Sequence, residues 1–140
     1  MARSANQKLK LMRLYQILFR QSDEDHPLTV QQLIQELERD GIAAERKSIY
    51  DDLEALRTLG IDVQSRKGRS SGWFIGQRDF ELPELKLLVD AVQSSRFITR
   101  KKSDALIKKL EGLASVHQAR QLQRQVYVDR RVKVMNESIY

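Results

Sequence analysis

The chain has 140 residues, 41% of them hydrophobic, and contains no cysteine. This length suits one compact domain, or a small domain with an appendage, and excludes a large enzyme fold, while the lack of cysteine excludes disulfides and thiolate metal sites. The net charge of +6 suits a polyanionic partner, but residues 1–78 hold 13 Lys or Arg against 11 Asp or Glu and residues 79–140 hold 12 against 8, so any nucleic-acid contact must come from local clusters.

Two amphipathic helices are expected before residue 41. Apolar residues at helical spacing predict the first over about residues 6–21. Thr29, with Gln32 three residues later, predicts the capping box of the second helix, which Gly41 ends. The expected buried face of the first helix is Leu11, Met12, Tyr15, Leu18 and Phe19. The expected buried face of the second is Val30, Leu33, Ile34 and Leu37.

A third helix and a β-hairpin are expected next. Ile49, Leu53 and Leu56 share one face of a helix over about residues 45–59, which Gly60 ends. Two β-prone runs, 61–63 and 73–75, flank a loop rich in Gly, Ser, Arg and Lys, and alternation should turn one of Trp73 and Phe74 onto the helices. Two helices joined by a tight turn and followed at once by a basic-tipped hairpin are typical of a winged helix-turn-helix.

The third helix and the hairpin tip carry the candidate DNA-binding residues. With its apolar residues turned inward, the helix exposes Lys47, Ser48 and Tyr50, which could contact base edges and phosphates in a major groove. Arg46 lies nearer the expected buried edge and suits a backbone contact. Asp51 would repel phosphate unless it accepts a hydrogen bond from a cytosine amino group or pairs with a basic neighbour, and it could also exclude wrong sites. The hairpin tip adds three basic residues that could reach the adjacent minor groove or its phosphates: Arg66, Lys67 and Arg69.

Other interpretations of these residues stay open. Exposed basic residues also occur on helices that are merely solvated, and winged helices also serve as protein-interaction modules. Catalysis finds no support, because His26 and His117 have no partner at metal-ligand spacing and the order Lys67-Gly68 before a strand does not match a nucleotide-binding loop. We therefore expect no catalytic residue, no metal and no cofactor.

Residues 79–126 predict a helical linker. Pro83 suits a first helical position and Thr99 an N-cap, so helices are expected over about 83–96 and after 99, followed by a short helical turn at 118–125. The alternating Val126, Val128, Val132 and Val134 suggest an extended tail. A helical hairpin alone cannot cover both of its apolar stripes, so these stripes must pack on the winged helix, on a missing domain or on another subunit. We assign the two stripes to dimerisation: Leu85, Leu88, Val89, Val92, Leu106, Ile107, Leu110 and Leu113.

Two segments carry a resemblance to a known family. Residues 45–56, ERKSIYDDLEAL, and residues 80–92, FELPELKLLVDAV, resemble the WYL-domain transcription regulators, named for a Trp-Tyr-Leu tripeptide in their effector domain. The resemblance implies a bacterial regulator with a winged helix, a helical linker and a ligand-sensing domain. The Trp-Tyr-Leu segment is absent, which implies a fragment without ligand sensing. Glu45 replaces an expected Ser, Thr or Asp cap, and Asp51 stands where some relatives have Arg, so no operator sequence can be borrowed.

These patterns predict a mainly α fold with a small β-hairpin. A winged helix-turn-helix is expected at 1–78, a helical linker and dimerisation segment at 79–126, and an extended tail at 127–140. The expected function is sequence-specific binding of double-stranded DNA in transcription regulation, as a homodimer without an effector ligand in this fragment. Neither a signal peptide nor a run of roughly 20 apolar residues is present, so we expect a cytoplasmic protein without a membrane partner.

Overall fold

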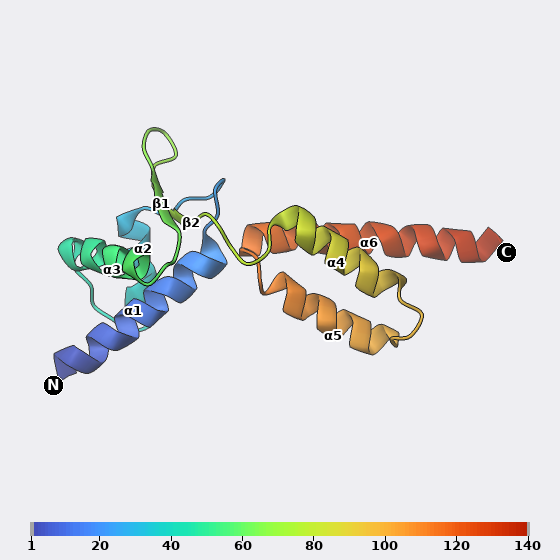
Figure 1. The fold of residues 1–140 in the computed structure, drawn as a ribbon, viewed down its shortest axis with the longest axis horizontal. Coiled ribbons are helices and arrows are strands. Elements are labelled where there is room, and N and C mark those ends of the chain that lie inside the picture. The colour runs from blue at the N-terminus through green and yellow to red at the C-terminus, as the bar shows by residue number, and fades with distance from the viewer. Residues whose placement is uncertain (1, 140) are drawn as a thin grey trace. The chain divides into compact units, whose positions relative to one another are not determined.

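A computed structural model describes the backbone of residues 2–139 and the side chains of residues 7–127. Within that part, six helices and one two-stranded antiparallel sheet follow in the order α1–α2–α3–β1–β2–α4–α5–α6 (Figure 1). The fold is therefore mainly α with a small β-hairpin, as the sequence predicted. The chain divides into two compact units, unit 1 (Met1–Arg78) with α1 to β2 and unit 2 (Asp79–Tyr140) with α4 to α6.

The elements of unit 1 follow the sequence signals closely. Its elements are α1 (Ala2–Gln21), α2 (Val30–Arg39), α3 (Arg46–Thr58), β1 (Val63–Arg66) and β2 (Gly72–Ile75). The capping box of α2 is present, because the Gln32 amide donates to the Thr29 hydroxyl over 3.1 Å while the Thr29 amide donates to the Gln32 side chain over 2.8 Å. The strand β1 begins at Val63, later than predicted, and the Asp62 carboxylate accepts the Gln77 amide over 2.7 Å at the base of the hairpin.

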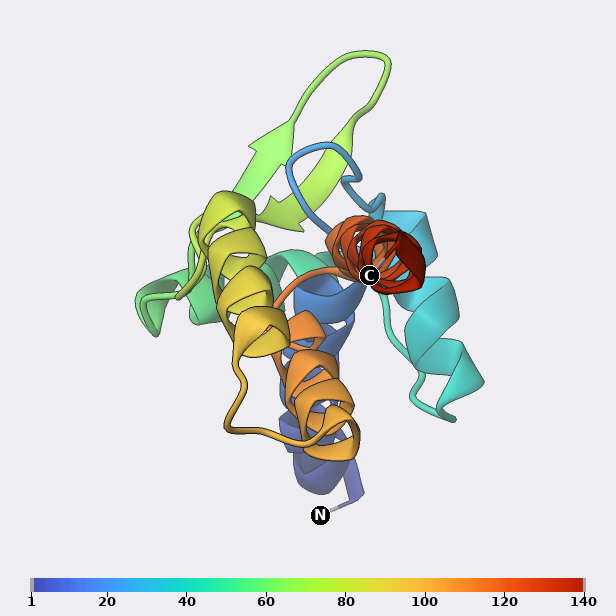
Figure 2. The ribbon, with the colours of Figure 1, turned by 90° about the vertical axis from the view of Figure 1, so that its right-hand side faces the viewer.

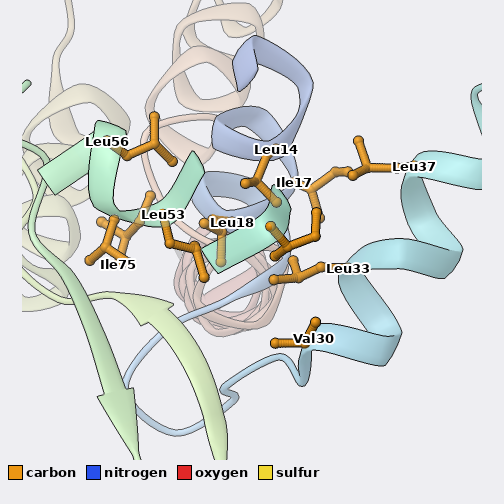
Figure 3. Packing of buried hydrophobic residues seen from close by; sticks show 11 residues of the cluster. Leu14, Ile17, Leu18, Val30, Leu33, Leu37, Leu53, Leu56 and Ile75 are labelled. Atoms are coloured by element: carbon orange, nitrogen blue, oxygen red, sulfur yellow. The ribbon is translucent and has the colours of Figure 1, made fainter. Parts of the chain in front are cut away.

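One apolar core holds unit 1 together. Buried side chains of the three helices and the hairpin point toward one another between α1, α2 and α3 (Figure 3). The predicted inward faces of α2 and α3 are confirmed, except that Ile34 is only half-buried. The buried members of this core are Leu14, Ile17, Leu18, Val30, Leu33, Leu37, Ile49, Leu53, Leu56, Val63 and Ile75.

The predicted buried face of α1 was partly wrong. Leu14 and Ile17 are buried, whereas Met12 is 66% exposed and Tyr15 is exposed as well. Both stripes have helical spacing and share Leu18, so periodicity cannot choose between them. The choice is made by packing, since the stripe that contains Leu14 and Ile17 is the one that meets α2 and α3 in the core.

The hairpin is fastened to the segment that precedes α2. Leu28 and Trp73 exchange two backbone hydrogen bonds, of 2.8 and 2.6 Å, so Leu28 acts as a third, one-residue strand beside β2. Gly72 makes this approach possible: it has a positive φ of 152°, and a Cβ there would lie 2.6 Å from the Leu28 carbonyl oxygen. Trp73 is half-buried against the core, while its neighbour Phe74 is buried.

Buried polar groups tie the far ends of unit 1 together. The Ser22 hydroxyl accepts the Ile75 amide over 3.2 Å and donates to the Leu18 carbonyl over 2.5 Å. The Arg78 guanidinium donates to the carbonyls of Phe19 and Ser22, at 2.7 and 2.5 Å, and so satisfies carbonyls that the end of α1 leaves open. Desolvation lowers the pKa of Arg78, and the nearby Asp23 carboxylate opposes this shift.

Unit 2 is built from three helices. They are α4 (Leu82–Ser94), α5 (Arg100–Glu111) and α6 (Val116–Ile139), and each packs on the other two. In the view of Figure 1, α4 and α5 run next to each other. The buried residues of this core are Leu85, Val89, Ile107, Ala114 and Leu122.

The third helix of unit 2 changes the interpretation of the linker. The sequence predicted only a short helical turn at 118–125 and an extended tail at 127–140, but α6 runs to Ile139. No Gly or Pro occurs after Gly112, so the helix can propagate without interruption, and valines spaced four apart fit a helix as well as a strand. The side chains of Val128, Val132 and Val134 lie outside the described residues.

α6 also covers most of the residues assigned to dimerisation. Leu85, Val89 and Ile107 are buried in the core of unit 2, and only Leu106, 38% exposed, stands outside it. The stripes therefore do not need another subunit or domain to cover them. The prediction assumed that α4 and α5 form a hairpin on their own, whereas α6 packs against both. The remaining assigned residues are half-buried against the same core: Leu88, Val92, Leu110 and Leu113.

Candidate nucleic-acid interface

The helix α3 turns a polar face away from the core of unit 1. Ile49 and Leu53 are fully buried on its inner side, and residues about half a helical turn away must face solvent. Lys47, Tyr50 and Asp51 are exposed there. The first two turns of α3 therefore present an amine, a phenol and a carboxylate on one accessible surface.

The start of α3 differs in two details from the prediction. Arg46, expected near the buried edge, is exposed. Ser48 is half-buried, and its hydroxyl donates to the Glu45 carbonyl over 2.9 Å, so its proton is already engaged within the helix. Glu45 makes no side-chain cap hydrogen bond. The helix thus begins with two exposed cations, Arg46 and Lys47, and a serine turned back on its own backbone.

A buried ion pair fixes α3 against α1. Lys10 is only 7% exposed, and its Nζ lies 3.0 Å from Oδ2 of Asp52. Asp52 directly follows the exposed Asp51, so the two adjacent carboxylates have different surroundings. Because a buried charge is costly without its partner, the pair restricts how α3 can rotate about its axis and thereby sets which residues it exposes.

The hairpin tip projects away from the helices of unit 1 (Figures 1 and 2). Lys67 and Arg69 are exposed in the loop between β1 and β2, and Gly68 between them takes a positive φ of 103°. Arg66 behaves differently: it is half-buried, with its guanidinium carbon 6.0 Å from the centre of the Phe74 ring. Two of the three predicted wing cations are thus fully available to a ligand.

Three side chains link α3 to the hairpin, and we call them the α3–wing clamp: Tyr50, Arg57 and Trp73. The Arg57 Nε donates to the Val63 carbonyl over 2.8 Å, and its guanidinium carbon lies 5.2 Å from the centre of the Trp73 ring. The Tyr50 and Trp73 rings meet edge to face, with centroids 6.0 Å apart. The clamp therefore holds the exposed face of α3 and the wing in one fixed arrangement.

Sequence reasoning missed Arg57. A signal was present, because Tyr50 and Arg57 are seven residues apart, which places them two turns along the same face of a helix. Arg57 also neutralises an acidic neighbour: its guanidinium lies 2.6 Å from the Glu54 carboxylate. One of the carboxylates on α3 that would oppose a polyanion is thereby paired, while Asp51 on the exposed face is not engaged in any described hydrogen bond or ion pair.

Comparison with family models, curated proteins and solved structures finds no match for this chain. Function must therefore be inferred from the geometry of the chain itself. The resemblance to the WYL-domain regulators remains a prediction from the sequence.

Other site chemistries find little support among the described residues. Within residues 7–127, no cluster of three or more His, Cys, Asp or Glu side chains could hold a metal ion. His26 lies 2.8 Å from the buried Asp23 carboxylate, which also accepts the Asp25 amide, so this group orders the loop after α1. None of the helices in the described part combines the length and the apolarity that crossing a bilayer requires.

Proposed function

We propose that unit 1 binds double-stranded DNA sequence-specifically and that the chain acts in transcription regulation. One observation carries the proposal: the exposed face of α3 and the basic wing tip belong to one compact unit, and the α3–wing clamp joins them. A protein that reads base edges and grips the neighbouring phosphates needs both surfaces in a fixed relation. The resemblance to WYL-domain regulators, which act in bacteria, supports the same function and a cytoplasmic location.

The face of α3 offers a donor and an acceptor one turn apart. Lys47 can donate to the O6 or N7 of guanine, and Asp51 can accept from the N4 amino group of cytosine. Because residues at i and i+4 lie side by side on a helix, the two side chains can reach neighbouring base pairs. Tyr50 is held by Trp73, which leaves its hydroxyl suited to a phosphate. These contacts would give the sequence preference.

The wing supplies the contacts that are independent of sequence. Lys67 and Arg69 at its tip can pair with phosphates or enter an adjacent minor groove. Unit 1 has only two more basic than acidic residues, 13 against 11. Binding by this unit should therefore depend on these few local contacts rather than on an overall positive field.

Binding as a homodimer belongs to the same proposal, since operators are commonly pairs of half-sites read by symmetric proteins. The packing of α6 leaves Leu106 as the exposed member of the residues first assigned to the dimer. A dimer would accordingly use surface outside the core of unit 2.

The test is selection of bound fragments from random duplex DNA, followed by binding titrations with three variants. We expect an enriched motif, and two half-sites if two copies bind together. Lys47→Ala should cost about 1–3 kcal/mol on the selected sequence and little on random DNA. Arg69→Ala should weaken binding to both and reduce the slope of log K against log salt by about 0.9.

Lys8→Ala is the matched control, because Lys8 is an exposed lysine on α1 and its removal changes the net charge by the same amount. It should leave both affinities nearly unchanged. Absence of any retarded complex at low salt would contradict the proposal and favour a protein-interaction module. Equal losses of affinity for all three variants would show attraction by net charge alone.

A further inference from the structure

A strongly basic surface patch lies in unit 2, outside the candidate interface of unit 1. Four cations and one aromatic residue between positions 96 and 102 are exposed, and no acidic residue occurs from position 91 to position 103. The nearest acidic residues along the chain, Asp90 and Asp104, lie on either side of this stretch. We call these five residues the 96–102 patch: Arg96, Phe97, Arg100, Lys101 and Lys102.

The backbone beneath the patch is ordered by two hydroxyl groups. The Phe97 amide donates to the Ser95 hydroxyl over 3.3 Å, and the Lys102 amide donates to the Thr99 hydroxyl over 3.3 Å. Phe97 is nevertheless 99% exposed. The loop therefore holds a phenyl ring in solvent between basic side chains, although nothing in the packing of unit 2 requires an apolar residue there.

The cations of α5 stand at the end of the helix that disfavours them. Arg100, Lys101 and Lys102 are its first three residues, and its first turn contains no acidic residue. A helix N-terminus carries partial positive charge, so cations there are repelled and anions are attracted. The arrangement costs stability in the isolated chain, and this cost is removed when a polyanion lies against the patch.

We propose that the 96–102 patch is a second DNA contact of the chain, which binds backbone phosphates of duplex DNA without reading sequence. The choice of duplex DNA as the ligand rests on the function proposed for unit 1. The evidence for the patch is independent of that function, because its five residues all lie in unit 2. Four long cationic side chains suit closely spaced phosphates, and an exposed phenyl ring suits sugar or minor-groove contact. A membrane surface fits less well, because interfacial helices present a whole apolar face rather than one ring.

The test uses the full chain and a 30-base-pair duplex of random sequence, titrated at several salt concentrations. The patch variant carries Arg96→Gln, Arg100→Gln, Lys101→Gln and Lys102→Gln together. Removing one cation that neutralises a phosphate should reduce the slope of log K against log salt by about 0.9, so we expect a reduction of about 2–4 for the four together. Phe97→Ser alone should weaken binding while leaving that slope unchanged.

The matched control removes four other exposed cations of unit 2, through Lys86→Gln, Lys109→Gln, Arg120→Gln and Arg124→Gln. It makes the same change in net charge and should reduce the slope by less than 1. An equal reduction in both variants, or none in the patch variant, overturns the proposal. Loss of binding to phosphatidylserine vesicles without any change on DNA overturns it in favour of a membrane surface.

A second set of variants separates this inference from the function proposed for unit 1. If unit 1 does not bind DNA, Lys47→Ala with Arg69→Ala leaves binding to the random duplex unchanged while the patch variant still reduces it. If the patch does not bind DNA, the opposite result is obtained. Without DNA, the patch variant should melt about 1–4 °C higher than the parent, because cations leave the positive end of α5. A lower melting temperature would contradict the electrostatic argument.

Discussion

The two units of the chain are held together by different means. In unit 1, two of the polar contacts that join distant elements are buried: Lys10 with Asp52, and the Ser22 hydroxyl with the Ile75 amide. In unit 2, the described side-chain hydrogen bonds between helices are exposed, and the Gln125 amide donates to both the Lys86 carbonyl and the Asp90 carboxylate, over 3.2 and 2.5 Å. An apolar core also joins its three helices.

The difference teaches where the chain requires precise orientation. Apolar contacts are non-directional, so the core of unit 2 constrains the orientation of its helices through packing alone. A buried ion pair or hydrogen bond loses its energy when its geometry changes. Unit 1 therefore fixes the rotation of α3 and the direction of the wing, as the proposed reading of DNA requires, whereas the phosphate contact proposed for the 96–102 patch tolerates a looser support.

The largest effect should come from the two cores. Leu53→Ala in unit 1 and Leu122→Ala in unit 2 each remove a fully buried side chain, and each should cost about 2–5 kcal/mol. Trp73 is the only tryptophan, so its fluorescence reports on unit 1, while circular dichroism follows the helices of both units. Leu53→Ala should shift the fluorescence transition, and Leu122→Ala should shift only part of the dichroism transition. One transition that moves equally for both variants would show that the units unfold as one body.

A smaller effect should come from the buried ion pair. Lys10→Met removes the partner of the Asp52 carboxylate. Because the Asp52 side chain is 19% exposed and so partly hydrated, we expect the free energy of unfolding in urea to fall by about 2 kcal/mol. The double variant Lys10→Met with Asp52→Leu should recover most of it. Arg13→Met is the control, since it removes an exposed pair with Asp40 and should cost at most about 1 kcal/mol. Equal losses of unfolding free energy from Lys10→Met and Arg13→Met would show that the buried ion pair contributes no more to stability than the exposed one.

The smallest effect on stability, but a larger one on binding, is expected at the α3–wing clamp. Arg57→Met removes the hydrogen bond to the Val63 carbonyl and the cation above Trp73, for about 1–2 kcal/mol. With the wing less well fixed, Arg69→Ala should then weaken DNA binding less than it does in the parent chain. Arg57→Lys, which keeps the charge, should restore part of this dependence. An unchanged effect of Arg69→Ala would mean that the clamp does not position the wing.

Local sequence signals predicted the elements of unit 1 well. Thr29 and Gln32 marked the start of α2 because a capping box needs only four neighbouring residues. The exposure of Lys47, Tyr50 and Asp51 followed from helix geometry once the inner face of α3 was recognised. Those predictions succeeded because each depends on residues that are close in the chain.

Features that depend on distant residues could not be predicted in the same way. The pairing of Leu28 with Trp73 and the ion pair of Lys10 with Asp52 join segments that no local pattern relates. Packing against α2 and α3 decides which face of α1 is buried, because the spacing of its apolar residues fits two faces equally well. The length of α6 was missed because its alternating valines fit two kinds of structure, and without that helix the core of unit 2 was taken for a dimer surface.

The close approach at Gly72 has a consequence for protein engineering. No other residue fits there, because any side chain would collide with the backbone of Leu28. A wing transplanted from another protein, or a library that varies the hairpin, must keep this glycine and treat the stretch before α2 as part of the same cassette. A protein that receives this wing would likewise need an extended backbone segment in the place of Leu28. The junction between the wing and that segment, rather than the loop tip, therefore decides which transplants can fold.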